Sequence, residues 1–452
     1  MNEAPPPPHD VEPYWHRRSW WLRTGRSGIV MFVGTGFGFF TTIVVGRALG
    51  PGNLGLLALA TVTVASIATF LDFSLEEAVV HHGARLIAEE RPGEVRALLR
   101  TSLKLDAAVG ATVFAALMLL ASPIADFVSH GALPSLLIRL AALEVLTTTV
   151  NGTTGAALLL GGQSALRAAA MAWTTLLRLV SVVVAVRMFS GGAEAVLWGY
   201  IAGSGLGAAS QLLLARRTAR AWGGPRAGRR PVGMRSLAGF GLHSSVTTTV
   251  VAARAAIVAV ILGRTAGAAG IGLLAVAMLP VILAAIATAP LRIMMFPEQA
   301  TLAAQGRLDV LWRGVRAYTG AALAIGTVAA VVGYLILPSL IPWVYSEGFR
   351  RAVAPARILL PAAVVTLAVA WAKALPAAVG RPQIRTWVSV GELIVTAIVV
   401  GALAHRGALG AATAISVSTV AGGIVWWLIA QRMLARASPS LATGAMERTG
   451  RA

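Results

Sequence analysis

The chain has 452 residues, of which 57% are hydrophobic and only 12% charged, and its mean hydropathy is +0.75. Soluble domains carry about 25% charged residues, so this composition excludes an ordinary soluble protein and predicts a polytopic membrane protein. Cysteine is absent, which excludes disulfides, Cys-ligated metal centres and thiol catalysis, and the net charge of +20 is first a signal of membrane topology rather than of a nucleic-acid partner.

Apolar runs long enough to cross a bilayer recur along the chain. Lipid cannot satisfy exposed backbone groups, and the runs are continuous rather than alternating, so the spans are predicted to be helices. We predict twelve of them: 28–48, 54–74, 105–122, 135–158, 166–187, 194–214, 239–262, 271–292, 318–338, 355–378, 387–404 and 408–430.

Arginines concentrate in every second connector, most densely in 75–104 and 215–236. The positive-inside rule then places both termini of this multi-pass membrane protein in the cytoplasm. Topology explains the basic 215–236 stretch, and a patch for anionic membrane lipid is the alternative. The resulting plan has five parts: a tail 1–27, a first half 28–214, a linker 215–238, a second half 239–430 and a tail 431–452.

A long internal repeat supports two halves. Residues 46–60 reappear at 263–277, an offset of 217, with glycines at 46, 50 and 55 returning at 263, 267 and 272. A unit of this length is too long for a solenoid and is typical of transporters built from two related halves. Six spans per half give both halves the same orientation. The sequence therefore predicts an all-α membrane protein with a central cavity between two parallel-oriented six-helix halves.

Two motifs resemble a known family. Gly46-Arg47-Ala48-Leu49-Gly50-Pro51-Gly52-Asn53-Leu54-Gly55-Leu56-Leu57 resembles the first extracytoplasmic turn of bacterial polysaccharide (Wzx-like) flippases, a branch of the multidrug/oligosaccharidyl-lipid/polysaccharide exporter superfamily. Asp72-Phe73-Ser74-Leu75 resembles that family's Asp-Leu-Gly-Leu segment, with Ser74 in place of the usual glycine. The resemblance extends over residues 26–436. It implies a protein of the bacterial inner (cytoplasmic) membrane with a lipid-linked oligosaccharide substrate that is flipped to the outer leaflet.

The sequence lacks the motifs that several kinds of catalysis require. Neither Lys104 nor Lys373 is followed by Ser or Thr, so no P-loop exists, and no paired aspartates could hold a sugar-nucleotide metal. No cofactor and no enzymatic activity is expected. The spacings Gly34-x-x-x-Gly38 and Gly203-x-x-x-Gly207 predict close helix packing rather than a nucleotide loop.

Charged residues inside spans need a reason, because a charge at mid-span costs about 2.5–3.5 kcal/mol on insertion scales. Glu144 and Arg178 lie at one depth in the adjacent fourth and fifth spans, and Lys373 and Glu392 lie at one depth in the tenth and eleventh. Each pair is either a packing ion pair or a cavity pair that breaks during transport.

Arg254 lies near the middle of the seventh span, and its repeat counterpart Phe37 is apolar. No acid lies in its own span, so an unpaired arginine in a net-basic central cavity is one reading, which would suit the diphosphate of a lipid-linked glycan. The alternatives are a partner acid on another helix and snorkelling to water.

A polar cluster closes the second span. Asp72, Glu76, Glu77, His81 and His82 lie there, either as a solvated helix end or as a titratable gate, because histidine titrates near pH 6.5.

The sequence predicts an alternating-access flippase without ATP hydrolysis. Substrate contacts are assigned to Arg254, Arg178, Lys373 and Glu144, and gating or coupling to Asp72, Glu76, His81 and Glu392. The polysaccharide polymerase or glycosyltransferase machinery is a candidate partner. Rival functions are a cation-coupled drug or metabolite exporter, a peptidoglycan-precursor flippase, and a membrane-embedded glycosyltransferase or polymerase.

Overall fold

The computed structural model describes residues 18–71, 75–189, 192–220, 222, 234–381 and 383–435, and no strand occurs among them. The longer helices are α1 (Arg18–Leu71), α2 (Leu75–Ala88), α3 (Pro92–Ser129), α4 (Ser135–Thr148), α5 (Asn151–Leu160), α6 (Ser164–Met188), α7 (Ala193–Arg220), α8 (Met234–Thr265), α9 (Gly267–Ala277), α10 (Leu279–Ala304), α11 (Leu308–Val344), α15 (Gln383–Ala402) and α16 (Ala408–Ala435). Between α11 and α15 the chain forms short helices: η2 (Glu347–Ala352), α12 (Val353–Ile358), α13 (Leu360–Ala368), η3 (Ala370–Lys373) and α14 (Leu375–Ala378).

The twelve predicted spans map onto these helices. Within the described ranges seven helices are long and apolar enough to cross a membrane, and two pairs bent by 41° and 49° (α9 with α10, and η2–α12 with α13) raise the number to nine. The helix α1 is counted once but contains two predicted spans. The last two predicted spans correspond to α4 together with α5, and to α7. An all-helical architecture of about twelve spans is therefore confirmed.

The kink in α1 shows how the sequence sets this geometry. Gly50 has φ 66° and ψ 177°, and Pro51 follows it. A left-handed φ is easy only for glycine, and proline lacks the N–H that would continue the helix, so the chain turns back here. In the repeat, Gly267 has φ 64° at the start of α9, which is the same turn 217 residues later.

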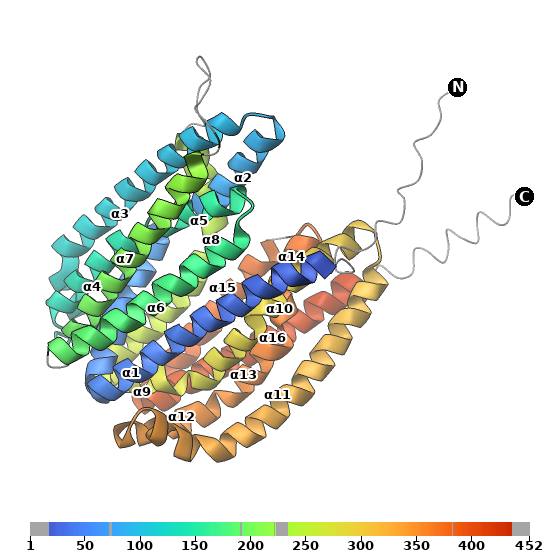
Figure 1. Ribbon diagram of the computed structural model, residues 1–452. Coiled ribbons are helices and arrows are strands. Elements are labelled where there is room, and N and C mark those ends of the chain that lie inside the picture. The colour runs from blue at the N-terminus through green and yellow to red at the C-terminus, as the bar shows by residue number, and fades with distance from the viewer. Residues whose placement is uncertain are drawn as a thin grey trace, which may run out of the picture.

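We call the end of the bundle that carries these turns the Gly50 end, and the opposite end, where α2 and α14 lie, the linker end. The helices converge at the Gly50 end, around α1, α9 and α12, and diverge toward the linker end (Figure 1). The beginning of α1 and the end of α16 both lie toward the linker end. By the topology predicted from the arginines, the Gly50 end faces outside.

The two halves cross at a pair of repeated glycines. A β-carbon on Gly55 would lie 1.6 Å from the carbonyl oxygen of Ala268, and one on Gly272 would lie 1.9 Å from that of Pro51. The 217-residue offset relates Gly55 to Gly272 and Pro51 to Ala268, so the two contacts are symmetry mates of each other. The repeat is therefore a structural pseudo-twofold, and the crossing of the two halves lies on its axis.

Repeated arginines reinforce the crossing. Arg47 donates from Nε to the carbonyl of Val344 at 2.6 Å and from Nη2 to that of Trp343, at the end of α11. Arg264 donates from Nη1 to the carbonyl of Phe127 at 3.2 Å, near the end of α3. Phe127 and Val344 are again 217 residues apart, so each half's arginine binds the last carbonyls of a helix in the other half. Cations suit that position because free carbonyls give a helix C-terminus partial negative charge.

Glycines also allow the close packing predicted within the first half. A β-carbon on Gly203 would lie 2.4 Å from Cα of Arg178, and one on Gly207 would lie 2.4 Å from the Thr174 side chain, so α7 packs directly on α6. A β-carbon on Gly34 would lie 2.9 Å from Cα of Ala172, which brings α1 equally close to α6. The Gly203/Gly207 spacing is therefore confirmed as a close packing site, whereas in the Gly34/Gly38 spacing only Gly34 is that close, since a β-carbon on Gly38 would lie 3.6 Å from the Thr175 side chain.

Candidate functional site

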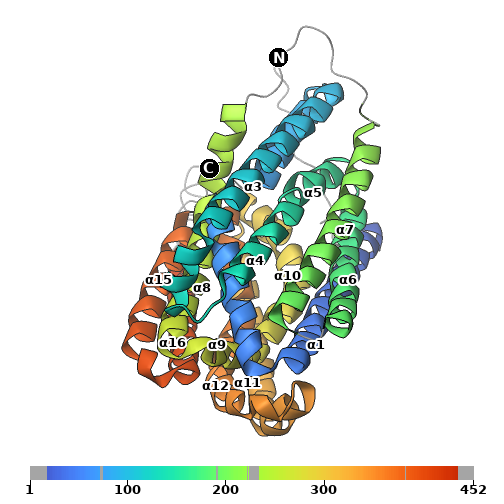
Figure 2. The same cartoon turned by 90° about the vertical axis from the view of Figure 1, so that its left-hand side faces the viewer.

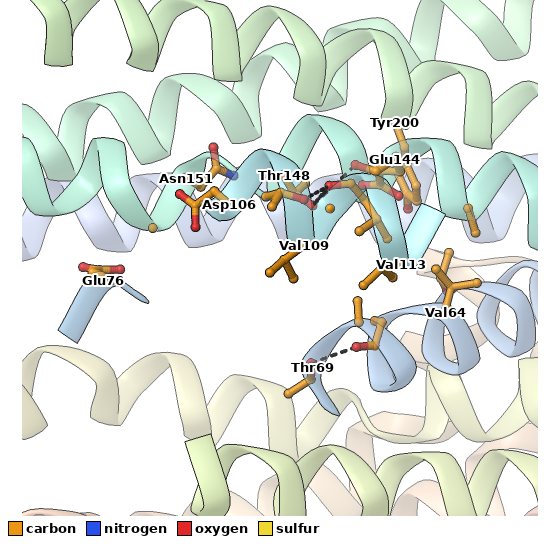
Figure 3. Close-up of a pocket in the computed structure, with 18 of the residues that line it drawn as sticks. Val64, Thr69, Glu76, Asp106, Val109, Val113, Glu144, Thr148, Asn151 and Tyr200 are labelled. Atoms are coloured by element: carbon orange, nitrogen blue, oxygen red, sulfur yellow. Dashed lines mark hydrogen bonds between the residues drawn. The ribbon is translucent and has the colours of Figure 1, made fainter. Parts of the chain in front are cut away.

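A cavity of about 900 Å³ lies in the first half, with lining residues between Thr61 and Tyr200. Its walls come from α1 to α7, and its polar lining is Thr61, Thr69, Glu76, Glu77, Asp106, Glu144, Thr148, Thr149, Asn151, Arg178 and Tyr200. In Figure 3, Asp106 and Asn151 lie toward one end with Glu76 facing them, while Glu144 and Tyr200 lie further along. This size suits a ligand of several sugar units or a drug-sized molecule.

The predicted pair of Glu144 and Arg178 forms in this cavity. Arg178 Nη2 lies 2.8 Å from Glu144 Oε1, and the two side chains are 34% and 14% exposed. The guanidinium also stacks over the ring of Tyr200, 4.2 Å from its centroid, and Ser204 donates to Glu144 at 3.4 Å. The close α6–α7 packing at Gly203 holds Arg178 in this position.

A second ion pair lies toward the linker end. Arg167, near the start of α6, donates from Nη2 to Glu76 of α2. Glu76 is thus tied to α6, and Figure 3 shows its carboxylate at the cavity wall. A link between two wall elements at a cavity edge is the kind of contact that a gate breaks and remakes, which keeps Glu76 a candidate gating residue.

The charge of the cavity differs from the sequence expectation. Its lining includes the carboxylates of Glu76, Glu77, Asp106 and Glu144 but only one guanidinium, that of Arg178. The sequence predicts a net-basic cavity between the two halves, whereas this cavity is lined by the first half alone and its wall carries more acids than bases. The acids come from three helices, α2, α3 and α4, so their convergence depends on the fold and leaves no local pattern in the sequence.

Arg254 lies in the second half, within a bonded network. Its Nη1 lies 3.0 Å from Glu392 Oε2, and its Nη2 donates to Ser418 at 2.9 Å and to Thr419 at 3.0 Å. The expectation that Arg254 lacks an acid partner is therefore wrong, and the alternative of an acid on another helix is confirmed. The carboxylate fits against α16 because Gly422 has no side chain, since a β-carbon there would lie 2.3 Å from Glu392 Oε1.

The other predicted residues are placed less fully. The side chain of Lys373 and the whole of Asp72 lie outside the described residues, so the predicted Lys373–Glu392 pair stays a prediction. His81 and His82 lie on α2, with ring centroids 5.3 Å apart. Burial, then His81 and Arg85, lower the pKa of His82 below its ordinary value of 6.5. No cluster of His, Asp and Glu suited to a metal ion occurs in the described part of the chain.

Sequence reasoning missed three wall residues: Asp106, Asn151 and Tyr200. Asp106 is 5% exposed and sits beside the first residue of a predicted span, where an acid looks like an ordinary helix end. The signal in the sequence was helical spacing: Val109 and Gly110, at i+3 and i+4, are apolar and share the helix face of Asp106, and in the structure both line the same cavity.

Comparison with known proteins agrees with this architecture. Residues 24–298 match the family model described as polysaccharide biosynthesis protein. A MOP-superfamily transporter from Pyrococcus furiosus, described by the reverse polarity of its binding pocket, aligns at 13% identity over 92% of this chain and 96% of its own, with a TM-score of 0.67. An outward-facing multidrug resistance MATE family transporter of the same superfamily aligns at 15% identity, with the same coverage and a TM-score of 0.65.

A Vibrio cholerae MATE transporter aligns at 15% identity over 92% of this chain and 98% of its own, with a TM-score of 0.60. None of the curated protein sequences matches. The family match covers well over half of the chain, so the chain belongs to the polysaccharide biosynthesis protein family, and it has the fold of MOP-superfamily transporters.

Proposed function

We propose that this member of the polysaccharide biosynthesis family flips a polyprenyl-diphosphate oligosaccharide from the inner to the outer leaflet by alternating access. One observation carries the proposal: the family match over 24–298 includes every lining residue of the 900 Å³ cavity. The fold is one of transporters, and without a P-loop the driving force is an ion gradient, the membrane potential or consumption of the product outside. Transport rather than catalysis is the activity.

The cavity offers complementary contacts for such a head group. Carboxylates and the Asn151 amide accept hydrogen bonds from sugar hydroxyls, and the Tyr200 ring offers an apolar face to a pyranose. Arg178 is the one cation on the wall and is assigned to the diphosphate, because guanidinium binds phosphate oxygens in a bidentate manner. Glu144 holds Arg178 in place until the phosphate arrives. The polyprenyl chain stays in lipid.

The network around Arg254 is assigned to the same transport cycle. Arg254 and Lys373 contact the substrate in another step of the cycle, and Glu392 is the group that releases Arg254 for this. Asp72, Glu76 and His81, which lie close together in the sequence at the end of the second predicted span, act as the gate at the linker end.

The test is mass spectrometry of lipid extracts from cells with and without the protein. Loss of the protein should lead to accumulation of a polyprenyl-diphosphate glycan, whose mass identifies the glycan and separates a surface polysaccharide from a peptidoglycan precursor. Restored wild type should clear it. An unchanged lipid-linked pool would refute flipping, and a pool of incomplete glycans would point to an enzyme.

Paired variants separate substrate contact from packing. Arg254→Gln leaves Glu392 without its cation, so a defect in that variant alone is ambiguous. The double variant Arg254→Gln/Glu392→Gln removes both charges together and keeps hydrogen-bonding groups. If the accumulated glycan persists in the double variant while the protein level recovers, Arg254 acts on the substrate. If clearance recovers, its role is packing.

A cation-coupled exporter is the second candidate function, and the acidic cavity is the observation that favours it. Four carboxylates against one guanidinium suit a cationic substrate or a coupling ion more than an isolated anion. Uptake of a fluorescent organic cation into proteoliposomes, driven by an imposed ion gradient and abolished by Asp106→Asn, would favour this candidate.

A further inference from the structure

A second cavity of about 440 Å³ opens on the outside of the first half, away from the transport cavity. Its walls are the linker-end segments of α3 and α7, and its floor is part of α5. We call it the α3–α7 groove. These parts of α3, α5 and α7 lie next to one another toward the upper end of the bundle in Figure 2.

Four arginines line the α3–α7 groove, and no carboxylate does. Arg96 and Arg100 are four residues apart on α3, and Arg216 and Arg220 are four apart on α7, so each helix presents a pair on one face. None of the four forms an ion pair or hydrogen bond with any residue that the structure describes. Four guanidinium groups facing one small space repel each other unless an anion joins them.

The rest of the groove is apolar. Leu99, Leu103, Leu212, Ala215 and Ala219 form its sides, and Ala157 lies on its floor with Thr153 and Thr154. A free inorganic anion would gain nothing from these apolar walls, whereas an amphiphile with an anionic head would use both parts of the groove.

The exposed face of α7 supports a lipid occupant. Trp198, Leu206 and Leu213 are 48%, 56% and 58% exposed on a helix predicted to lie in the membrane. At about 100° per residue, these three side chains and those of Arg216 and Arg220 fall within an arc of about 80°. An apolar stripe of that kind faces acyl chains, and the two arginines continue it where the head groups begin.

We propose that the α3–α7 groove binds the phosphate head group of an anionic phospholipid from the leaflet at the linker end. The guanidinium groups of Arg96, Arg100, Arg216 and Arg220 bind the phosphodiester oxygens, and the acyl chains follow the α7 stripe. The groove is separate from the transport cavity, since the two have no lining residue in common. The bound lipid ties α3 to α7 and stabilises the first half.

The test is native mass spectrometry of the full-length protein in detergent, titrated with cardiolipin and, as a neutral probe, phosphatidylcholine. The groove variant changes all four groove arginines to Gln. The matched control removes the same charge from exposed arginines outside the groove: Arg307, Arg316, Arg385 and Arg432. A third variant, Ala219→Trp, fills the groove without changing any charge.

Wild type and the control should retain cardiolipin, and the groove variant should bind it at least about tenfold more weakly, as expected when several basic contacts are removed. Ala219→Trp should weaken cardiolipin binding as well, and phosphatidylcholine should show no difference. Equal loss in the groove and control variants, or unchanged binding in both, would overturn the proposal. So would unchanged cardiolipin binding accompanied by loss of glycan clearance, because the groove would then belong to the lipid-linked substrate.

Discussion

The reciprocal arginine contacts at the Gly50 end predict that removing them opens that end. Arg47 makes two hydrogen bonds to carbonyls of the other half and Arg264 makes one, with a further contact to the Phe127 ring at 5.3 Å. Hydrogen bonds to charged groups contribute about 1.5–3 kcal/mol each when they are shielded from water, but both side chains are exposed, so we assign about 1 kcal/mol to each of the three bonds. The double variant Arg47→Gln/Arg264→Gln should therefore favour opening by about 3 kcal/mol, or roughly a hundredfold.

The absence of cysteine provides the assay. Leu59 is fully buried and packs where Gly263 approaches, 3.3 Å from the position of a β-carbon there. Leu59→Cys would react with a membrane-impermeant maleimide only while the Gly50 end is open. An open population of about 0.1% would rise to about 10% in the double variant, with a matching increase in the labelling rate.

The matched control is Arg187→Gln/Arg350→Gln, which removes the same charge near the Gly50 end. Arg187 is exposed at the end of α6, and Arg350 pairs only locally with Glu347 at 2.8 Å among the described residues. Labelling of Leu59→Cys should be unchanged in this control. If the Arg47/Arg264 variant labels no faster than the control, the arginine contacts do not hold this end closed and the reasoning fails.

Three further predictions concern the first half. Glu144→Gln leaves the two-thirds-buried Arg178 without its acid and should lower the free energy of unfolding by about 2–3 kcal/mol, below the full cost of breaking a buried pair; Glu144→Gln/Arg178→Gln should restore most of it, as measured by thermal unfolding in detergent. Gly203→Ala places a β-carbon 2.4 Å from the α6 backbone and should cost about 1–3 kcal/mol, whereas Gly205→Ala, whose β-carbon meets only a methyl at 3.7 Å, should be near neutral in the same measurement. Because the pKa of His82 is lowered in the fold, the unfolded chain binds more protons just below pH 6.5 and stability falls as the pH drops through that range; His82→Gln should flatten this fall in melting temperatures measured from pH 7.5 to 5.

The repeat predicted more of the structure than any single residue did. Its offset of 217 was read from residues 46–60 and 263–277, and the same offset relates contact partners far outside that stretch, such as Phe127 and Val344. The Glu144–Arg178 pair was predictable for a related reason. The two residues lie on consecutive antiparallel spans, at about eight and nine residues from the outer ends predicted for those spans, which places them at one depth.

The Arg254 network could not be predicted in this way. Glu392 lies 138 residues from Arg254, on α15, which is not consecutive with α8 in the chain. Its predicted depth was also nearer the inner end of its span than that of Arg254. Depths counted from predicted boundaries carry an error of a few residues, and an arginine side chain reaches over more than one helical turn. Depth matching therefore finds partners on consecutive helices and misses those whose neighbourhood is set by tertiary packing.

The residues at the Gly50 end and the acids of the cavity differ in whether the repeat gives them a counterpart in the other half. At the Gly50 end, Gly55 and Arg47 have counterparts in Gly272 and Arg264 that make the reciprocal contacts. The cavity acids have no such counterparts, because at the same offset Glu76 corresponds to Ile293 and Asp106 to Leu323.

Contact between the two halves and binding of a substrate place different demands on symmetry. Two halves that close against each other across a twofold axis need matching surfaces, so the closure residues are constrained in both halves. The substrate that we propose, with a polar head group and a lipid tail, is itself asymmetric, and symmetric binding residues would present two equivalent sites where one is used. In the transport cycle proposed above, the symmetric contacts among the described residues are therefore assigned to the joint between the halves, and the departures from symmetry to the surfaces that meet the substrate.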